Sequence, residues 1–305
     1  MNEIQSILVG NIPLLITADG YRQLMVSAFP LIPAAGQPTG VKSYAQSCRE
    51  VFMPTDDDCD IHITMDYDDP ELPDASVAYH RVWGFITAAS RWFFSTKQLE
   101  ADLLAAEHNP QICAHFLHVN SPGGEAWYLD HLDQTMQQIE KPVVVLYEMA
   151  CSAAYHIACH GQRVYATTRF DFVGSIGTMT SFWDFQPYYE QLGIRKVEAK
   201  ADCSDLKNKM GDDLTNGHPR QYIDNVLNPL NDAFLSTVRT CRPQLAQLAD
   251  DHPALRGETY FTEQAVEVGL CDGQRTFDEA LHECHELGKA WQQATRQKQS
   301  LYTLL

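Results

Sequence analysis

The sequence predicts an α/β fold built on a mostly parallel β-sheet. From Val77 onward, short apolar runs alternate with segments of helical periodicity. The runs at 112–119 and 142–147 have the length and β-branched content of strands, and the helical segment at 125–139 lies between them. Strands separated by helices of this length form parallel sheets with right-handed crossovers. A chain of 305 residues is long enough for one large domain of this kind.

The individual elements follow from two patterns: apolar runs for strands, and a period of about 3.6 residues for helices. Strands are expected at 77–86, 112–119, 142–147, 163–167 and 195–199. Helices are expected at 96–107, 125–139, 152–160, 182–192, 220–248, 262–268 and 276–291. Ser95 suits the N-cap of the first helix, whereas Pro229 should interrupt the longest helix and Pro243 should end it.

Three regions are expected along the chain. Residues 1–76 lack the alternating pattern and form a partly ordered N-terminal extension that contacts the domain edge or a neighbouring subunit. Residues 77–287 form the main domain, and residues 288–305 form a loose, polar C-terminal tail. Acidic runs at 56–60 and 66–69 lack the spacing of an EF-hand, so we expect solvated acidic loops there and not a metal site.

The composition argues against several classes of partner. A net charge of −18 disfavours nucleic acid, because phosphate binding requires clustered Lys and Arg, and it also disfavours anionic membranes. No uncharged apolar run reaches the roughly 18 residues of a membrane span, and no signal peptide is evident. We therefore expect a cytoplasmic protein without a stable membrane anchor.

The cysteines point to a reducing compartment. All nine are scattered singly, without CxxC pairs, which suits buried or free thiols better than a disulfide framework. The spacing matches no zinc-binding pattern, and neither a metal nor a cofactor is expected.

Ser152 is the candidate nucleophile. It follows the apolar run 142–147 and precedes an alanine-rich helical segment, so its hydroxyl should lie at a strand-to-helix turn on the rim of the sheet. Gly123 and Gly124 follow the preceding strand, where a glycine turn can direct backbone N–H groups into a site. Ligands of such sheets bind at the carboxyl ends of the strands, where both features should meet. A nucleophile and donors for an oxyanion are the parts that amide hydrolysis requires.

Four motifs in this order resemble the signal-peptide-peptidase-A-like serine peptidases of the Clp-protease/crotonase superfamily. They are Val119-Asn-Ser-Pro-Gly-Gly124, Lys141-Pro-Val-Val-Val145, Ala150-Cys-Ser-Ala-Ala-Tyr155 and Gly174-Ser-Ile-Gly177. A later segment, from Arg256-Gly-Glu to Gly269-Leu-Cys-Asp-Gly273, resembles the family too, so the similarity covers roughly 77–287. The resemblance implies a ClpP/crotonase-like fold of repeated ββα-type units. It also implies a serine endopeptidase, with Gly123 and Gly124 at the oxyanion hole.

The resemblance further implies a Ser-Lys dyad. The lysine of the family lies some fifty residues after the serine, and here that segment runs from Lys200 to Lys209. We expect Lys207 to be the general base, with Lys200 and Lys209 as alternatives that spacing cannot separate. A lysine base must be neutral near neutral pH, so burial has to lower its pKa.

Two positions depart from the family pattern. Ala153 and Ala154 stand where two glycines usually follow the nucleophile, and Cys151 replaces an alanine before it. We expect the turn to survive and the Cys151 side chain to point into the core. A Ser-His-Asp arrangement is disfavoured, because His156 and His160 lie on the helix that Ser152 begins and are expected to be packing or surface residues.

The resemblance also bears on substrates and partners. The lack of a membrane anchor favours a relative of the phage prohead proteases, which trim capsid or scaffold proteins. A bacterial cytosolic peptidase that degrades peptides is the alternative, and a catalytically silent assembly scaffold is a second one. Because family members assemble into rings in which one subunit can complete the site of another, we expect a homo-oligomer. Acyl-CoA chemistry of the crotonase type is disfavoured by the placed serine.

Overall fold

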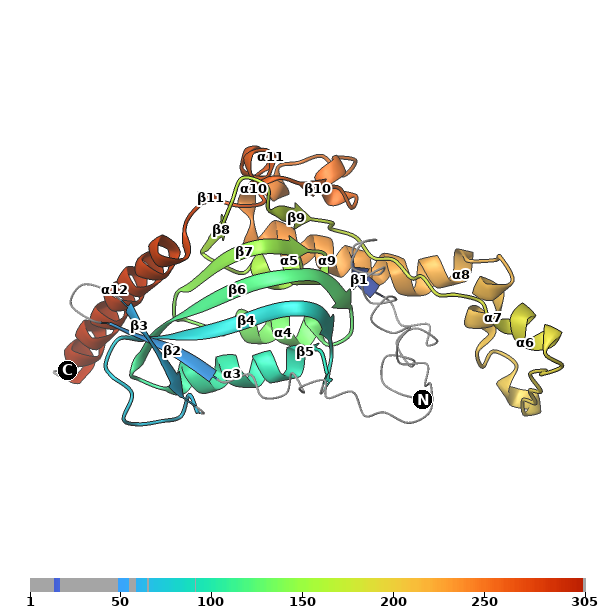
Figure 1. Cartoon of the computed structure of the whole chain (residues 1–305), viewed down its shortest axis with the longest axis horizontal. Helices are drawn as coiled ribbons and strands as arrows, with labels where there is room; N and C mark the ends of the chain where they lie inside the picture. Colours follow the sequence, from blue (N-terminus) through green and yellow to red (C-terminus); the bar gives the residue numbers. More distant parts are fainter. Residues whose placement is uncertain (1–13, 17–48, 55–58, 65, 91, 304–305) are drawn as a thin grey trace.

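The computed structural model describes residues 14–16, 49–54, 59–64, 66–90 and 92–303, and a single twisted β-sheet lies at its centre (Figure 1). The main path through the sheet has the strand order β10-β9-β7-β6-β4-β2-β3. The central strands β4 (Ser76–Thr87), β6 (Ile112–Glu125) and β7 (Val143–Cys151) pair in parallel. The predicted α/β fold with a mostly parallel sheet is therefore confirmed.

The remaining strands extend this centre. β8 (Arg163–Ala166) and β9 (Phe172–Gly174) both pair in parallel with β7, β5 (Phe94–Ser95) pairs with β4, and β11 (Gly273–Gln274) pairs with β8. Antiparallel pairs lie at the periphery: β1 (Leu14–Ile16) with β6, β2 (Arg49–Pro54) with β3 (Cys59–Thr64) and β4, and β10 (Thr259–Tyr260) with β9. Through β2 and β3, part of the predicted N-terminal extension contacts the edge of the main domain.

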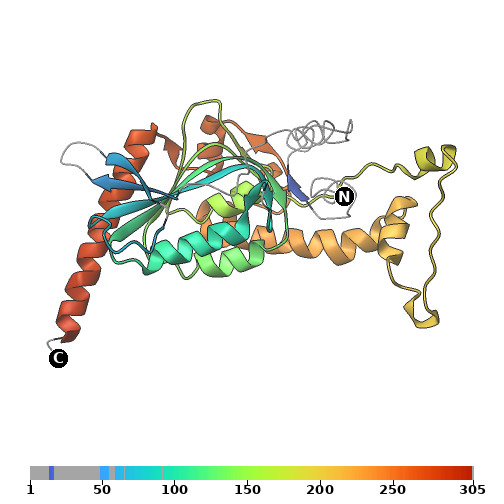
Figure 2. The same ribbon diagram turned by 60° about the horizontal axis from the view of Figure 1, so that its bottom comes forward.

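Burial of both faces explains the uninterrupted apolar run of β7. Val143, Val145 and Tyr147 pack in the larger core, whereas Val144 and Leu146 pack in a second core on the opposite face. The larger core is covered by α3 (Thr96–His108), α4 (Leu129–Met136), α5 (Ala153–Ala158) and α9 (Asn228–Cys241). The second core is covered by α12 (Phe277–Thr303), which crosses the other side of the sheet (Figures 1 and 2).

Several predicted helices form as expected. Ser95 caps α3 by accepting a hydrogen bond from the backbone N–H of Gln98, and α11 (Thr262–Val268) has the predicted bounds. The long helix predicted at 220–248 is divided into α8 (Arg220–Tyr222), a π-helical turn (Ile223–Leu227), α9 and α10 (Pro243–Ala246). A 3-10 turn (Pro253–Leu255) follows. Pro229 lies in the first turn of α9, where the missing N–H costs no hydrogen bond.

Residues 178–222 leave the sheet and form an arm that projects from the body of the molecule (Figures 1 and 2). The arm holds α6 (Gln186–Gln191), a 3-10 turn (Asp202–Ser204) and α7 (Lys209–Thr215). The prediction of a strand at 195–199 was wrong, because this segment is not paired with any strand that the structure describes. The helix predicted at 182–192 is shortened to α6, which buries none of its residues.

Two further helices begin or end at residues other than those predicted. The helix predicted from residue 125 begins only at Leu129, because β6 continues through Glu125. The tail was expected to be loose, but α12 continues through Thr303. Two contacts to Asp74 hold this extension: Gln292 Nε2 donates to its carboxylate at 2.9 Å, and Arg296 forms an ion pair with it.

The first of the two acidic runs is described only in part, and its residues 59–60 begin β3 and do not lie in the expected loop. Positions 56–58 of the first run lie outside the described residues. In the second run, Asp66 and Asp69 each accept a hydrogen bond from the backbone N–H two residues later, at 3.1 and 2.8 Å. These are the local contacts of a polar turn, which agrees with the interpretation as an acidic loop.

Candidate active site

Ser152 lies at the turn between β7 and α5, as the sequence predicted. β7 ends at Cys151, α5 begins at Ala153, and Ser152 between them has φ 57° and ψ −119°. A non-glycine residue with positive φ is uncommon and requires support from its surroundings. Here the N–H of Ser152 donates to the carbonyl of Gly174 at 2.8 Å, which fixes the turn against the end of β9.

The Ser152 hydroxyl is buried but has no hydrogen-bond partner among the residues that the structure describes. The residue is 1% exposed. A buried hydroxyl that forms no hydrogen bond is costly, and exceptions of this kind are found at functional sites. The backbone of the turn therefore holds the Ser152 hydroxyl in a defined position, where it can form a hydrogen bond with a group that binds beside it.

The glycine motif lies beside Ser152 on the neighbouring strand. Ser121 of β6 pairs with Ala150 of β7, so the Gly123 region and Ser152 both lie about two residues further along at the same end of the sheet. Gly123 has φ 103°, and a Cβ atom on Gly124 would lie 1.9 Å from the carbonyl oxygen of Ile86. Only glycine fits this close approach of β6 to β4.

The N–H of Gly123 already has a local partner. It donates to the Ser121 hydroxyl at 3.1 Å, and that hydroxyl donates to the Gly84 carbonyl at 2.6 Å. These two bonds hold the end of β6 in place. For Gly123 to stabilise an oxyanion, its N–H has to exchange the Ser121 hydroxyl for the substrate oxygen.

An extended segment of the chain lies along this same end of β6. Leu14, Leu15 and Ile16 of β1 pair antiparallel with Glu125, Gly124 and Gly123. The edge of the sheet next to Ser152 can thus accept a strand through backbone hydrogen bonds.

The residues that depart from the family pattern are packed into the core. Ala153 and Ala154 are fully buried at the start of α5. Burial also raises the pKa of the Cys151 thiol to about 12, so this thiol stays protonated at neutral pH. A protonated thiol in the core is a poor nucleophile, which agrees with the expected inward direction of Cys151.

The three candidate lysines lie in the segment 200–209 of the arm, which projects away from the β7–α5 turn (Figure 1). Lys200 contacts the carboxylates of Glu198 and Asp212 at 3.1 and 3.2 Å, and Lys209 forms an ion pair with Asp213. The hydrogen bond to Glu198 raises the pKa of Lys200, which is opposite to what a general base needs. Lys207 is exposed, and no carboxylate in the described part of the chain pairs with its ammonium group.

The histidines bind other groups. His118 Nε2 lies 2.9 Å from Glu148 Oε1, and its Nδ1 lies 2.7 Å from the Tyr79 hydroxyl. His156 and His160 both contact the buried carboxylate of Asp133 through Nε2, at 2.9 and 2.8 Å. In the described residues no histidine contacts the Ser152 hydroxyl, so they form no Ser-His-Asp arrangement with Ser152. The role of Asp133 could not be foreseen, since it lies 23 positions before its nearer partner.

A cavity adjoins the Gly174–Gly177 segment, which sequence analysis singled out only as a motif. Its volume is about 320 Å³, and it is lined by Ile176, Gly177, Thr178 and, across from them, Asn231 and Arg256. Asn231 Oδ1 of α9 accepts a hydrogen bond from the Thr178 N–H at 3.2 Å, which connects the two sides of the cavity. The cavity wall begins at Ile176, two residues after Gly174, whose carbonyl accepts the hydrogen bond from the Ser152 N–H.

Comparison with known families places the chain among peptidases. Residues 135–291, more than half of the chain, match the model of Peptidase family S49. The chain therefore belongs to Peptidase family S49, and its expected similarity to signal-peptide-peptidase-A-like proteins is confirmed.

Three curated relatives carry names of the same kind. The chain is 28% identical over 189 residues to "Protease 4" of Haemophilus influenzae, which covers 61% of this chain and 30% of that protein. It is 25% identical over 201 residues to "Putative signal peptide peptidase SppA" of Enterococcus faecium, covering 63% and 56% of the two chains. For "Putative protease MJ0651" of Methanocaldococcus jannaschii, identity is 27% over 188 residues, covering 59% and 58%. The chain thus spans between 30% and 58% of the length of these relatives.

No helix in the described ranges has both the length and the apolar character needed to cross a membrane.

Proposed function

We propose that the protein is a serine endopeptidase with a Ser-Lys dyad, in which Ser152 is the nucleophile and Lys207 the general base. The observation that carries this proposal is the buried Ser152 hydroxyl, without a partner, on a turn with φ 57° at the carboxyl end of β7. Membership of a peptidase family supports it. No cofactor or metal enters the reaction.

The proposed reaction has two steps. Ser152 Oγ attacks the carbonyl carbon of the scissile bond while its proton passes to neutral lysine Nζ, and the lysine then protonates the leaving amine as the C–N bond breaks. Water attacks the resulting ester, gives a proton to Nζ, and releases the acid as the proton returns to Ser152. Gly123 and Gly124 supply the N–H donors for both tetrahedral oxyanions.

We propose that the lysine comes from the arm of a neighbouring copy in a homo-oligomer. Within one chain the arm points away from the nucleophile turn (Figures 1 and 2). The arm also exposes large apolar side chains, among them Trp183 at 60%, Val197 at 80% and Leu206 at 70%. Large apolar side chains that are exposed to solvent are typical of surfaces that bind another protein. Contact with a second copy would bury them, exclude water around Lys207 and lower its pKa.

Lys207 is preferred to its two alternatives because it has no carboxylate partner in the described part of the chain. A lysine that is paired with carboxylates stays charged, as Lys200 is with Glu198 and Asp212. Lys209 is held by Asp213 one helical turn further on. Lys207 carries no such contact, so its ammonium group can lose a proton when it is desolvated.

The substrate is proposed to bind as an extended strand along the end of β6. The antiparallel pairing of β1 with 123–125 is the geometry that such a peptide would take, and the peptide would replace β1 at this position. Addition of a strand uses backbone hydrogen bonds and needs no free end of the peptide, which favours an endopeptidase. The cavity beside Gly177 and Arg256 is then a candidate pocket for one substrate side chain.

Trimming of a phage capsid or scaffold protein stays a prediction about the substrate, with degradation of other peptides as its alternative. Coexpression with a co-encoded capsid protein tests it: cleavage that depends on Ser152 is the expected result, and an intact capsid protein beside an active peptidase would favour the alternative.

Labelling with a fluorophosphonate probe tests the proposed nucleophile. The wild-type protein should carry the probe on the peptide that contains Ser152, and Ser152→Ala should abolish both labelling and cleavage of an unfolded protein substrate. Cys151→Ala is the matched control, because it changes the adjacent buried side chain and should keep both signals. Equal cleavage by wild type and Ser152→Ala would reject Ser152 as the nucleophile, whereas a wild-type protein that neither takes the probe nor cleaves substrate would favour the silent scaffold.

A further inference from the structure

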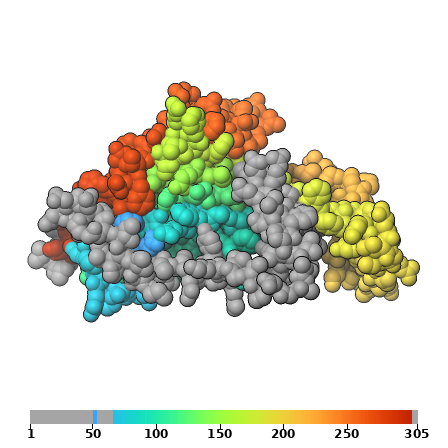
Figure 3. All heavy atoms as spheres, viewed as in Figure 1, coloured from blue at the N-terminus to red at the C-terminus, as the bar shows by residue number. Residues whose placement is uncertain are grey.

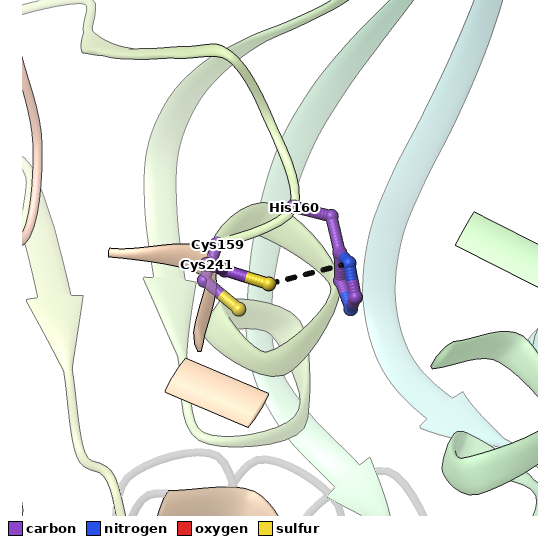
Figure 4. Close-up of side chains that lie close together, drawn as sticks. All are labelled: Cys159, His160 and Cys241. Carbon is purple, nitrogen blue, oxygen red and sulfur yellow. Dashed lines mark hydrogen bonds between the residues drawn. The ribbon is translucent and has the colours of Figure 1, made fainter. Parts of the chain in front are cut away.

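A second cluster of reactive side chains lies at the opposite end of α5 from Ser152. Cys159 is the residue at which α5 ends, His160 follows it, and Cys241 is the last residue of α9 (Figure 4). One ligand atom from each of the three residues lies within 4.8 Å of the other two. None of these side chains has a role in the proposed peptidase reaction.

The ring of His160 is oriented by a buried carboxylate. Asp133 accepts hydrogen bonds from His160 Nε2 at 2.8 Å, His156 Nε2 at 2.9 Å and the Thr237 hydroxyl at 2.6 Å. A proton on Nε2 leaves the lone pair on Nδ1, and Nδ1 lies 3.5 Å from Cys241 Sγ. A carboxylate behind the distal nitrogen is the usual support of a histidine that binds a metal.

The two thiols are placed to complete the same site. The Cys159 side chain is fully buried, and its Sγ donates a hydrogen bond of 3.2 Å to the His156 carbonyl within its own helix and also contacts the Cys241 thiol. Cys241 is half-buried, so the cluster can be reached from solvent on this side. By contrast, the buried Cys113 lies beside a single backbone carbonyl, that of Ala75, and belongs to no such group.

We propose that Cys159, His160 and Cys241 bind one thiophilic d¹⁰ cation, zinc(II) in the first place, that ties α5 to α9. Two thiolates and one imidazole form a donor set that selects Zn²⁺ or Cu⁺ over harder cations. Binding replaces the thiol protons, which pass to solvent, and the two thiolate charges neutralise a divalent ion. A fourth position is left for water.

The proposed metal site would join α5, the helix that begins after Ser152, to α9, the helix that follows the arm. α5 starts immediately after Ser152, and α9 continues from the arm through the π-helical turn. A metal at the C-terminal ends of both helices would therefore fix α9, the helix that follows the arm, against α5. This proposal does not depend on the Ser-Lys mechanism.

Metal analysis of the purified full chain tests the proposal. After expression with zinc and removal of loosely bound metal, mass spectrometry should find about one zinc or copper ion per chain. Cys241→Ser, at the half-buried position, should remove it. Asp133→Asn should weaken binding by roughly 10- to 100-fold, because the histidine loses its orienting carboxylate. Cobalt(II) bound in place of zinc should give a thiolate charge-transfer band in the wild-type protein, which does not depend on how well a variant folds.

Cys203→Ser is the matched control, because Cys203 is an exposed cysteine that could bind zinc non-specifically. It should keep the full metal content and the cobalt band. The proposal is overturned if the wild-type protein binds no more metal than Cys241→Ser. It is also overturned if the purified chain contains a Cys159–Cys241 disulfide, seen as two missing thiols in a thiol titration and a linked peptide pair.

Discussion

The nucleophile turn and the arm are opposite kinds of structure. Ser152 is 1% exposed and follows a strand that is buried on both faces, so its backbone has one available position. On the arm, Val197 is 80% exposed, and α6 buries none of its residues. Figure 3 shows the arm as a lobe beside the body, not packed over it. The turn of the proposed nucleophile is thus complete within one chain, whereas the candidate bases lie on a surface that no other element of the described residues covers.

In the proposed mechanism, this difference predicts which part of the site depends on assembly. The hydroxyl of Ser152 is placed by local geometry and by the bond from its N–H to Gly174, both of which exist in one chain. The pKa of a lysine base, however, has to be lowered by burial, and exposed Lys207 has none. A single copy is expected to be folded and inactive.

Substitution of the arm lysines should have the largest effect on activity. Lys207→Met should lower kcat/KM by about 10²- to 10⁴-fold, because general base catalysis is lost. Lys200→Met and Lys209→Met should keep kcat/KM within about tenfold, since both lysines are engaged with carboxylates. Steady-state cleavage of an unfolded protein measures all three. A loss confined to Lys200→Met or Lys209→Met would move the base to that residue.

Two glycine substitutions compare the body with the arm. Gly124→Ala would force a Cβ atom to within 1.9 Å of the Ile86 carbonyl oxygen and should cost several kcal/mol of unfolding free energy. Gly217→Ala, at φ +80° in open space on the arm, should cost only about 1 kcal/mol. Urea unfolding of the two variants measures the difference. Equal costs would contradict the tight approach of β6 to β4.

Charge on the exposed face of the arm should break assembly without unfolding the body. Leu206→Glu should dissociate the oligomer and lower activity, while the unfolding free energy of the body changes by no more than about 0.5 kcal/mol. Sedimentation and thermal unfolding measure the two quantities. Phe170→Glu is the control, because Phe170 is 60% exposed but lies off the arm. An oligomer that survives Leu206→Glu would place the interface elsewhere.

The last comparison concerns a buried lysine in the body, whose effect is confined to alkaline pH. Lys141 Nζ donates to the carbonyls of Ala106 and Asn109, both at 2.7 Å, and burial lowers its pKa to about 8. Between about pH 8 and 10.5 the unfolded chain binds one proton more at this group, so unfolding free energy should rise with pH by up to about 1.4 kcal/mol per unit. Lys141→Met should remove this rise relative to wild type in denaturant titrations at several pH values. An unchanged slope would show that Lys141 keeps its ordinary pKa when folded.

The sequence predicted those parts of the molecule whose structure is decided locally. The β7–Ser152–α5 turn was predicted correctly, because an apolar run followed by alanines determines both a buried strand and a helix start. The Ser95 cap was predicted because a serine directly before a helical segment can accept a hydrogen bond from the first turn of that helix. The placement of Gly123 beside Ser152 followed from parallel strand order.

Features that depend on distant partners could not be predicted. The strand expected at 195–199 failed because the segment has no neighbouring strand to pair with, which its own residues cannot reveal. The tail is helical because Gln292 and Arg296 contact Asp74, more than two hundred positions away. The Cys159–His160–Cys241 cluster was hidden for the same reason, since its third member lies on another helix.

Mixing two inactive variants tests the central claim most directly. Ser152→Ala lacks the nucleophile and Lys207→Met lacks the proposed base, so neither should cleave substrate alone. If the arm of one copy completes the site of another, an equimolar mixture that is dissociated and reassembled should regain about one quarter of wild-type activity. A mixture that stays inactive, although sedimentation shows mixed oligomers, would contradict a base supplied by a neighbouring copy.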